Sequence, residues 1–178
     1  MTAPSPQLAT LTGSWALDPG RSSVRLSSKA LGLIPVKGQF GEVSGNGTIG
    51  PDGAVRGTLT VATASIDTGN AKRDTHLRSA DLFDSDQYPD ITFAVDRAEL
   101  TGQGSEGQSA VLSGALTVRG VTRPLSFEAE VSVRGDGEIV LDGAVRINRA
   151  DFGLTWNVLG TASMLTTITV HALFTAAR

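Results

Sequence analysis

The sequence contains no cysteine, which excludes a whole set of structures and chemistries. Without thiols there are no disulfides to cross-link the fold, no thiolate nucleophile and no thiolate metal site. Long apolar runs are missing as well, because no stretch approaches the ~20 apolar residues of a membrane-spanning helix. The sequence therefore predicts a soluble chain that does not span a membrane.

Positive charge is sparse and scattered. Lys and Arg number 15 against 18 Asp and Glu, the net charge is −3, and aromatic residues make up only 5%. A nucleic-acid surface needs clustered Lys and Arg, with aromatics where bases are to stack. The two histidines, His76 and His171, lie far apart and are too few for a histidine metal site unless carboxylates complete it. We therefore expect no nucleic-acid partner, no metal and no cofactor.

The first dozen residues have a composition unlike the rest of the chain. They are rich in Pro, Ser, Thr and Ala and lack both a basic segment and an apolar run of signal-peptide length. The expectation is a flexible tail over residues 1–12, one domain over residues 13–178, and a cytoplasmic location. A chain of 178 residues with 40% apolar content is enough for one continuous core.

What the sequence does have is glycine, 21 residues, mostly between short apolar runs. Within these runs apolar and polar residues alternate with a period of two, as over residues 125–133 and 139–147. Asp136-Gly137 lies between these two runs and is a strong hairpin signal. The pattern is typical of antiparallel strands joined by tight turns.

The same pattern predicts eight strands. They cover residues 22–28, 36–49, 54–66, 91–100, 110–119, 124–134, 138–149 and 162–175. Asn46-Gly47 is expected to break or bulge the second strand, a short helix is expected within 71–80, and residues 151–160 are expected to form a loop over one barrel end. Such strands form a sandwich or a barrel, and mostly sequential hairpins favour closure because closure removes exposed edges. The fold class is all-β, with one extended eight-stranded antiparallel barrel.

The apolar face of these strands is expected to point inward. An outer-membrane barrel needs aromatic girdles, whereas this chain has one Tyr and two Trp. Small residues alternate with large ones at the inward positions: Gly38, Gly57, Gly114, Ala129, Gly143 and Ala172 interleave with Phe40, Leu59, Leu116, Phe127, Val145 and Phe174. Two interpretations stay open, one in which the small residues leave volume for a ligand and one in which they fit tight corners of a filled barrel.

Two motifs of possible chemical meaning have simpler structural interpretations. Gly102-x-Gly104-x-x-Gly107 matches a dinucleotide motif, but it lies in a hairpin loop rather than between a strand and a helix. The segment 72–78 gathers ionisable groups, and a hydrolase triad of His76, an aspartate and a serine is conceivable, although no G-x-S-x-G element accompanies it. The favoured alternative is a capped helix held against the barrel by hydrogen bonds of Arg73, Asp74 and His76.

Many ordered blocks resemble the YceI-like family of polyisoprenoid-binding proteins. They are Trp15-x-Leu17-Asp18, Val36-Lys37-Gly38-Gln39-Phe40, Ala64-Ser65-Ile66-Asp67-Thr68, Arg73-Asp74-x-His76-Leu77-Arg78-Ser79-x-Asp81-Leu82-Phe83-Asp84, Tyr88-Pro89-x-Ile91-Thr92-Phe93, Gly114-x-Leu116-Thr117-Val118-Arg119-Gly120-Val121-Thr122 and Arg149-x-Asp151-Phe152-Gly153-Leu154. They run in order from about residue 13 to the C-terminus, so the resemblance covers nearly the whole chain.

The resemblance implies an extended lipocalin-like barrel with a long isoprenoid chain in its apolar bore. The expected lining is Val24, Leu26, Phe40, Leu59, Val61, Phe93, Val95, Leu116, Phe127, Val145, Ile168, Val170 and Phe174. A polar cluster of Arg73, Asp74, His76, Arg149 and Asp151 is expected to close one barrel end or to meet a head group. Ala30 stands where many relatives carry a histidine, so no head-group or metal contact is expected from that position.

The leading hypothesis is therefore a binding and carrier protein for an isoprenoid lipid or isoprenoid quinone, without catalytic residues. A second hypothesis is a hydrolase or isomerase acting on a prenyl compound through Arg73, Asp74 and His76. A third is a filled barrel with a stress-related interaction role. Because relatives often pair, a homodimer is a further expectation.

Overall fold

The computed structural model describes residues 8–104, 107–135, 137–157, 160 and 162–178. Eleven strands form one sheet: β1 (Gly13–Leu17), β2 (Ser23–Ala30), β3 (Ile34–Phe40), β4 (Val43–Ile49), β5 (Val55–Ala62), β6 (Ile66–Asp67), β7 (Asp90–Gln103), β8 (Gln108–Val118), β9 (Val121–Arg134), β10 (Glu138–Asn148) and β11 (Leu165–Ala176). The helical elements are α1 (Ala71–Arg78) and the 3-10 turns η1 (Leu8–Leu11), η2 (Pro19–Arg21), η3 (Thr63–Ser65) and η4 (Arg149–Phe152). Among the described residues, none of these helices is long and apolar enough to cross a bilayer.

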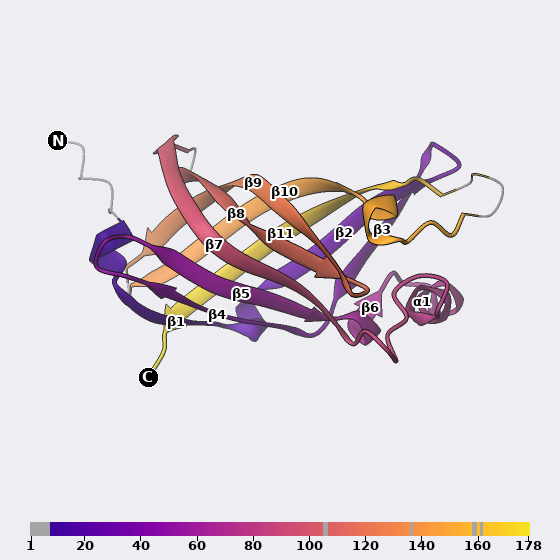
Figure 1. Cartoon of the computed structure of the whole chain (residues 1–178), viewed down its shortest axis with the longest axis horizontal. Coiled ribbons are helices and arrows are strands. Elements are labelled where there is room, and N and C mark those ends of the chain that lie inside the picture. The colour runs from indigo at the N-terminus through magenta and orange to yellow at the C-terminus, as the bar shows by residue number, and fades with distance from the viewer. Residues whose placement is uncertain (1–7, 105–106, 136, 158–159, 161) are drawn as a thin grey trace.

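Eight of the strands close into a long antiparallel barrel (Figure 1). The ring runs β1-β4-β5-β7-β8-β9-β10-β11 and returns to β1 through the pairing of β11 with β1. Each pairing in the ring is antiparallel, and the long consecutive strands β7 to β11 supply four of the eight pairings. The predicted fold class, an all-β eight-stranded antiparallel barrel with a short helix, is confirmed.

The first strands differ from the prediction. The strand expected over residues 36–49 is two strands, because the chain turns at Gly41-Glu42, where Gly41 N donates to Ser65 O at 3.0 Å, and not at Asn46-Gly47. Strand β1 was missed, since five residues are too few to show an alternating pattern. Strands β1 and β2 pair with successive stretches of β11, and η2 separates them. Pro19 in η2 prevents one continuous strand, because proline cannot donate to the ladder.

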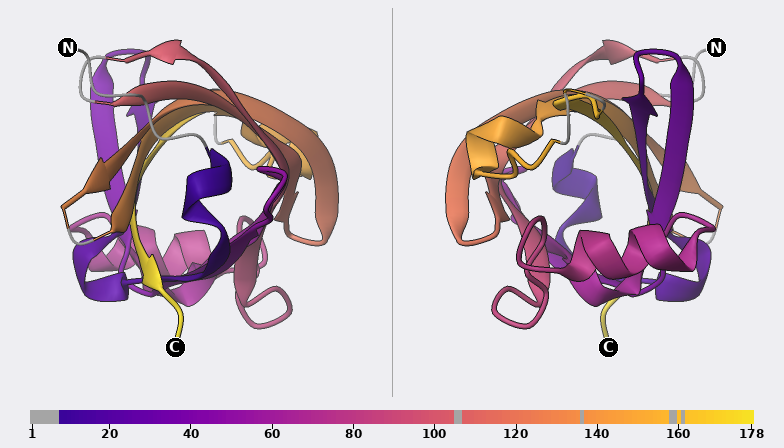
Figure 2. Two further views of the ribbon diagram at one scale, coloured as in Figure 1. Left: turned by 90° about the vertical axis from the view of Figure 1, so that its left-hand side faces the viewer. Right: turned by 90° about the vertical axis from the view of Figure 1, so that its right-hand side faces the viewer.

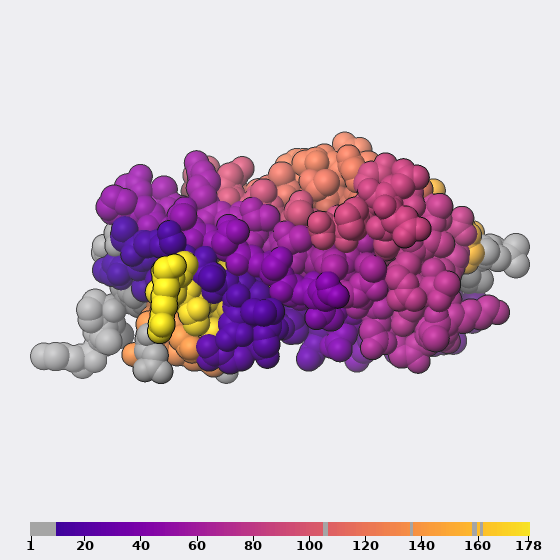
Figure 3. All heavy atoms as spheres, turned by 90° about the horizontal axis from the view of Figure 1, so that it is seen from below, coloured from indigo at the N-terminus to yellow at the C-terminus, as the bar shows by residue number. Residues whose placement is uncertain are grey.

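The two ends of the barrel carry different structures (Figure 2). One end, here called the helix end, carries α1, η4 and the β2–β3 hairpin. The opposite end, here called the terminal end, carries η1, the C-terminus and the turns after β4, β7 and β9. The space-filling view places the C-terminal atoms, in yellow, beside indigo atoms at the terminal end and the magenta region of α1 at the other (Figure 3). The barrel axis therefore connects two chemically different openings.

The local signals in the sequence account for most of the turns. Gly104 N donates to Gly107 O at 2.8 Å in the β7–β8 hairpin, so the glycine motif is a turn, as predicted. Gly137 has a φ of 78° and donates to Arg134 O between β9 and β10, while Asp136 lies outside the described residues. Helix α1 begins where Asn70 Oδ1 accepts from Arg73 N at 3.0 Å, an N-cap that fixes its start. The predicted short helix in this region is therefore confirmed.

The N-terminal segment is ordered closer to its start than the expected tail suggested. Leu8–Leu11 form the turn η1, and the indole Nε1 of Trp15 donates to Leu11 O at 3.0 Å. Figure 2 shows η1 across the opening of the terminal end. Residues 1–7 lie outside the described residues, so the expected tail is a prediction for those positions alone.

Candidate functional site

A cavity of about 510 Å³ occupies the bore of the barrel. Its lining extends from Leu11 and Trp15 at the terminal end to His76 and Arg149 at the helix end, so it runs the length of the barrel. The volume is in the range of ligand pockets, which are roughly 300 to 1,000 Å³. The barrel is thus not filled by its own side chains, and the filled-barrel hypothesis disagrees with the structure.

The side chains predicted to line the bore all face the cavity. They are Val24, Leu26, Phe40, Leu59, Val61, Phe93, Val95, Leu116, Phe127, Val145, Ile168, Val170 and Phe174. They share a face because each occupies alternate positions of its strand, and the antiparallel registers align them across the wall, as for Phe93 opposite Leu116. The rings of Phe93 and Phe127 lie 5.5 Å apart and form part of the wall. Their contact with a ligand stays a prediction.

The small residues at inward positions have two different roles. Gly57 and Ala172 line the cavity, as the hollow interpretation expects. At Gly143 a Cβ would lie 2.9 Å from Phe127 Cε2, and at Gly38 it would lie 2.8 Å from Thr68 Cγ2. At Gly114 it would lie 2.0 Å from the carbonyl oxygen of Ala94. These three glycines permit close contacts within the wall, so the volume comes from the width of the barrel and not from them.

Sequence reasoning missed lining residues of two kinds. Some continue the alternation beyond the predicted set, and that signal was available: Val36, Ile91, Leu112, Leu125, Val131, Ile139, Leu141 and Ile147. Others lie in the short strand β1, in α1 or in turns and loops, where no alternation identifies a face: Leu11, Trp15, Leu77, Leu82, Phe83, Phe152, Leu154 and Trp156. The second kind closes the two ends of the bore.

Arg73 and Asp74 fix the connection between β6 and α1. Asp74 Oδ1 accepts from Thr68 N at 3.0 Å and from Thr68 Oγ1 at 2.5 Å, and the Asp74 side chain is buried. Arg73 donates to Thr68 Oγ1 at 2.8 Å and to Thr68 O at 2.9 Å. The predicted role of these residues in holding the excursion against the barrel agrees with these contacts. Arg73 also lines the cavity, and Asp74 lies behind it.

Arg149 organises the chain that follows η4. Its Nε donates to Ser163 O at 3.0 Å, and Nη1 donates to Leu154 O at 2.6 Å and Trp156 O at 2.9 Å. Burial lowers the pKa of Arg149, because desolvation disfavours the charged form. A guanidinium stays charged at neutral pH even so. One partly buried cation therefore holds several carbonyl oxygens at the cavity mouth.

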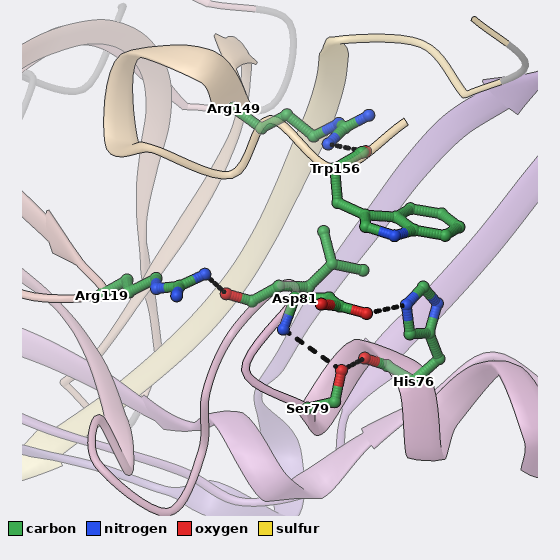
Figure 4. Close-up of polar contacts among 7 residues, drawn as sticks. His76, Ser79, Asp81, Arg119, Arg149 and Trp156 are labelled. Carbon is green, nitrogen blue, oxygen red and sulfur yellow. Dashed lines mark hydrogen bonds and ion pairs between the residues drawn. The ribbon is translucent and has the colours of Figure 1, made fainter. Parts of the chain in front are cut away.

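His76 connects α1 to the loop after η4 (Figure 4). Its Nε2 lies 3.0 Å from Asp81 Oδ2, and its ring contacts Trp156 edge-on with centroids 4.1 Å apart. The Ser79 hydroxyl donates to the main-chain oxygen of His76 at 2.6 Å and not to the imidazole. Arg119, between β8 and β9, donates from Nη1 to Leu82 O at 2.8 Å. This hydrogen bond attaches the turn after α1 to the barrel wall. Through these contacts, His76 connects helix α1 to the turn at Asp81 and to the loop at Trp156.

Asp151 lies in η4 at the helix end but apart from the cavity lining, so its expected part in the polar cluster stays a prediction. Its side chain is exposed and does not line the cavity, and its main-chain oxygen accepts from Arg123 Nε at 3.2 Å. The reason is the geometry of η4: Phe152, which is 5% exposed, takes the inward position next to it. Arg149, Asp151 and Phe152 lie close together in the sequence, but the 3-10 turn does not place their three side chains on one face.

The ionisable residues that line the cavity are all basic. They are Lys29, Arg56, Arg73, His76 and Arg149, and no described carboxylate lines it. All but Arg56 lie at the helix end. Ala30 lines the mouth and pairs with Ala162, and the described residues contain no group of three or more potential metal-ligating side chains. His171 faces away from the cavity, with Nδ1 2.5 Å from Asp142 Oδ1 on the neighbouring strand.

Comparison with known proteins identifies the family. The sequence model of the YceI-like domain matches residues 15–176. The chain belongs to the YceI-like family. A UPF0312 protein of Pseudomonas aeruginosa is 33% identical over 142 residues, which cover 76% of this chain and 71% of that protein.

Two solved structures show the same fold as this YceI-like chain. The crystal structure of Burkholderia cenocepacia BcnA has a TM-score of 0.78 at 23% identity and covers 89% of this chain and 99% of that one. A polyisoprenoid binding domain from Saccharophagus degradans, implicated in plant cell wall breakdown, has a TM-score of 0.73 at 20% identity and covers 92% and 98%. At these identities the likeness shows the YceI-like barrel and not a shared ligand.

Proposed function

We propose that this chain binds an extended isoprenoid lipid or an isoprenoid quinone in the bore of the barrel and carries it without changing it chemically. The observation that carries the proposal is the cavity of about 510 Å³, apolar along the strands and basic at one mouth. A thread-like amphiphile matches both properties, because its tail needs a long apolar bore and its head group needs a polar end.

Burial of the tail supplies the affinity in this proposal. Each buried methylene contributes about 0.8 kcal/mol, less the cost of ordering a flexible chain. Phe93, Leu116 and Val170 are among the apolar side chains that line the bore and could contact the tail. Affinity should therefore rise with tail length and stop rising when the tail fills the bore.

The helix end is where we place the head group. Arg73, His76 and Arg149 line the cavity there, and much of their hydrogen bonding goes to the protein itself. We propose that they shape the mouth and present positive charge to the head group, while the neighbouring loops adjust around it. The solved structure from Saccharophagus degradans that shares this barrel is a polyisoprenoid binding domain, and we extend that ligand class to this chain as part of the proposal.

The contacts of His76 favour carriage over catalysis. A serine hydrolase needs the nucleophile within hydrogen-bond reach of the base. Ser79 instead gives its hydroxyl hydrogen to a main-chain oxygen, and the imidazole is 3.0 Å from Asp81. Among the described residues, the contacts of His76 in segment 72–78 therefore favour a structural role for this segment over a catalytic one.

A chain-length series tests the proposal. Protein freed of lipid is titrated with isoprenoid quinones that share one head group and differ in the number of prenyl units. We expect the dissociation constant to fall with each added unit and then to level off. A dissociation constant that does not depend on tail length would contradict binding in the bore.

A further inference from the structure

Exposed apolar side chains gather at the helix end. The large apolar residues with the most exposed surface there are Leu33 (86%), Leu31 (63%), Ile34 (54%), Leu165 (46%) and Trp156 (37%). Leu31, Leu33 and Ile34, together with Gly32, form what we call the hairpin tip, which projects from the helix end between β2 and β3 (Figure 1). At the terminal end the corresponding set contains Val133 (36%). The two ends thus differ sharply in the apolar surface that they offer to a partner.

In the hairpin tip, Leu31 adopts a backbone conformation that leucine disfavours. Leu31 has a φ of 53° and Gly32 a φ of 72°, so both lie in the left-handed region. Glycine and asparagine adopt this region readily, whereas a leucine is strained there. Asparagine at position 31 would suit the turn better and would leave less apolar surface in water. Departures from local preference of this kind are expected where a residue serves another purpose.

The charged residues on the two strands of this hairpin, β2 and β3, are all positive. Arg25, Lys29 and Lys37 lie on β2 and β3 with exposed side chains, and no ion pair joins them to a described carboxylate. The sequence has no Asp or Glu between Asp18 and Glu42, nor after Asp151. The nearby acidic residues lie on β6, where Asp67 is opposite Gln39 of β3, and after α1, where Asp81 and Asp86 follow. The hairpin therefore combines an apolar tip with cationic flanks.

We infer that the hairpin tip inserts into the interfacial layer of an anionic lipid bilayer, so that the cavity mouth faces the membrane. Anionic leaflets attract exposed Lys and Arg, while apolar side chains gain by leaving water at the head-group boundary. Ala30 lines the cavity and directly precedes Leu31 of the hairpin tip, and Trp156 lines the cavity while 37% exposed, so apolar side chains extend from the bore to the surface at this end. A lipid following them would not cross water. The purpose that we give to docking, which is to pass a lipid between membrane and bore, rests on the proposed function. The test of docking itself does not depend on that function.

Vesicle sedimentation tests the inference directly. The full chain is mixed at low salt with vesicles of phosphatidylcholine and phosphatidylglycerol in about a 3:1 ratio, or of phosphatidylcholine alone. We expect clear binding to the anionic vesicles and weaker binding to the neutral ones. The double variant Leu31→Asn/Leu33→Ser should bind on the order of tenfold more weakly, since it removes the inserted side chains. Val133→Asn removes an exposed apolar residue at the opposite end and should bind like the natural chain.

Charge and orientation have their own readouts. Lys37→Glu should weaken binding and flatten its dependence on salt, whereas Arg134→Glu, at the terminal end, should do so much less.

The two tryptophans lie at opposite ends of the bore. Lipids brominated near the head group should quench the fluorescence of Trp156 in a Trp15→Phe variant. They should leave the fluorescence of Trp15 unchanged in a Trp156→Phe variant.

Two results would overturn the inference. One is equal sedimentation of the natural chain and the double variant. The other is concentration-dependent self-association, measured by analytical ultracentrifugation, that the double variant abolishes while neither protein binds vesicles; the hairpin tip would then contact a second copy. The lipid content of the purified protein is measured separately, because the double variant leaves the bore unchanged and should keep its ligand. Loss of docking and failure of the proposed function are thus distinguishable.

Discussion

The middle of the barrel and its helix end are held together by different interactions. In the middle, ladder hydrogen bonds set the register, and apolar side chains on alternate positions form the wall of the bore, as for Leu59 opposite Phe93. At the helix end, charged side chains bind main-chain groups of loops, as Arg149 does with Leu154 and Trp156. The comparison teaches that the bore depends on many weak, replaceable contacts and the mouth on a few strong ones. Single substitutions should therefore affect ligand binding in the middle and stability at the end.

The largest effect is expected from filling the middle of the bore. Val145→Trp places a large ring at an inward position of β10, where it takes the volume available to the tail. We expect affinity for an isoprenoid quinone to fall by about 100-fold, close to 2.7 kcal/mol. Ala144→Trp adds the same ring to the preceding residue, which is exposed on the outer face, and should leave affinity unchanged. Equal losses in the two variants, measured by ligand titration, would mean that the tail does not lie in the bore.

Next in size is the loss of the guanidinium that holds the mouth. Arg149→Met keeps a long side chain but leaves the carbonyl oxygens of Leu154, Trp156 and Ser163 without their donor. We expect the free energy of unfolding to drop by about 2 kcal/mol, because hydrogen bonds to charged groups are worth roughly 1.5 to 3 kcal/mol. Urea denaturation measures the drop. Arg146→Met, on the exposed outer face of β10 just before η4, is the control and should change stability little.

A smaller effect is expected at the connection between β6 and α1. Asp74→Ala removes the acceptor of two Thr68 hydrogen bonds and should destabilise the fold by about 1 to 2 kcal/mol. Thr68→Val removes one of the same bonds. If the two residues act through their mutual contact, the double variant should lose less than the sum of the single losses in urea denaturation. Full additivity would show that Asp74 stabilises the helix end by another route.

The smallest effect concerns an exposed ion pair outside both regions. The hydrogen bond from Arg21 Nε, 2.7 Å from Asp18 Oδ2, holds the pKa of the Asp18 carboxyl below its usual range. A carboxyl with a lowered folded pKa stabilises the fold above the unfolded pKa of about 3.9, and this contribution is lost as the pH falls through the folded value. The difference in thermal midpoint between the natural chain and Asp18→Asn should therefore be positive at neutral pH and shrink in acid. Arg21→Gln should weaken that pH dependence, because only the main-chain donors of Gly20 and Arg21 then remain, and an unchanged pH dependence would contradict the role of the guanidinium.

The same contrast explains how much of the molecule the sequence predicts. Alternation located the inward residues of the long strands, because a period of two assigns a face wherever a strand is paired on both sides. It missed β1, which is too short to show a period, and it merged β3 with β4 across Gly41-Glu42. Physically, that break depends on the distant contact of Gly41 with Ser65, which no local pattern contains.

The helix end was predictable only in part. Arg73, Asp74, His76 and Arg149 were identified as a cluster, but their partners are Thr68, Trp156 and main-chain oxygens that loop geometry brings into place. The side chain of Asp151 is exposed and does not line the cavity, which the sequence could not show because residue type and spacing do not fix the direction of a side chain in a 3-10 turn. Trp156, which covers His76 and lines the mouth, was anticipated as part of a covering loop and not as a cavity residue.

The central claim is that the bore holds an isoprenoid compound, and native mass spectrometry of freshly purified protein tests it most directly. The account predicts a complex heavier than the polypeptide that releases, on denaturation, a lipid whose fragments differ by the mass of one prenyl unit. A bare polypeptide mass that stays unchanged after incubation with isoprenoid quinones and polyprenols would contradict it.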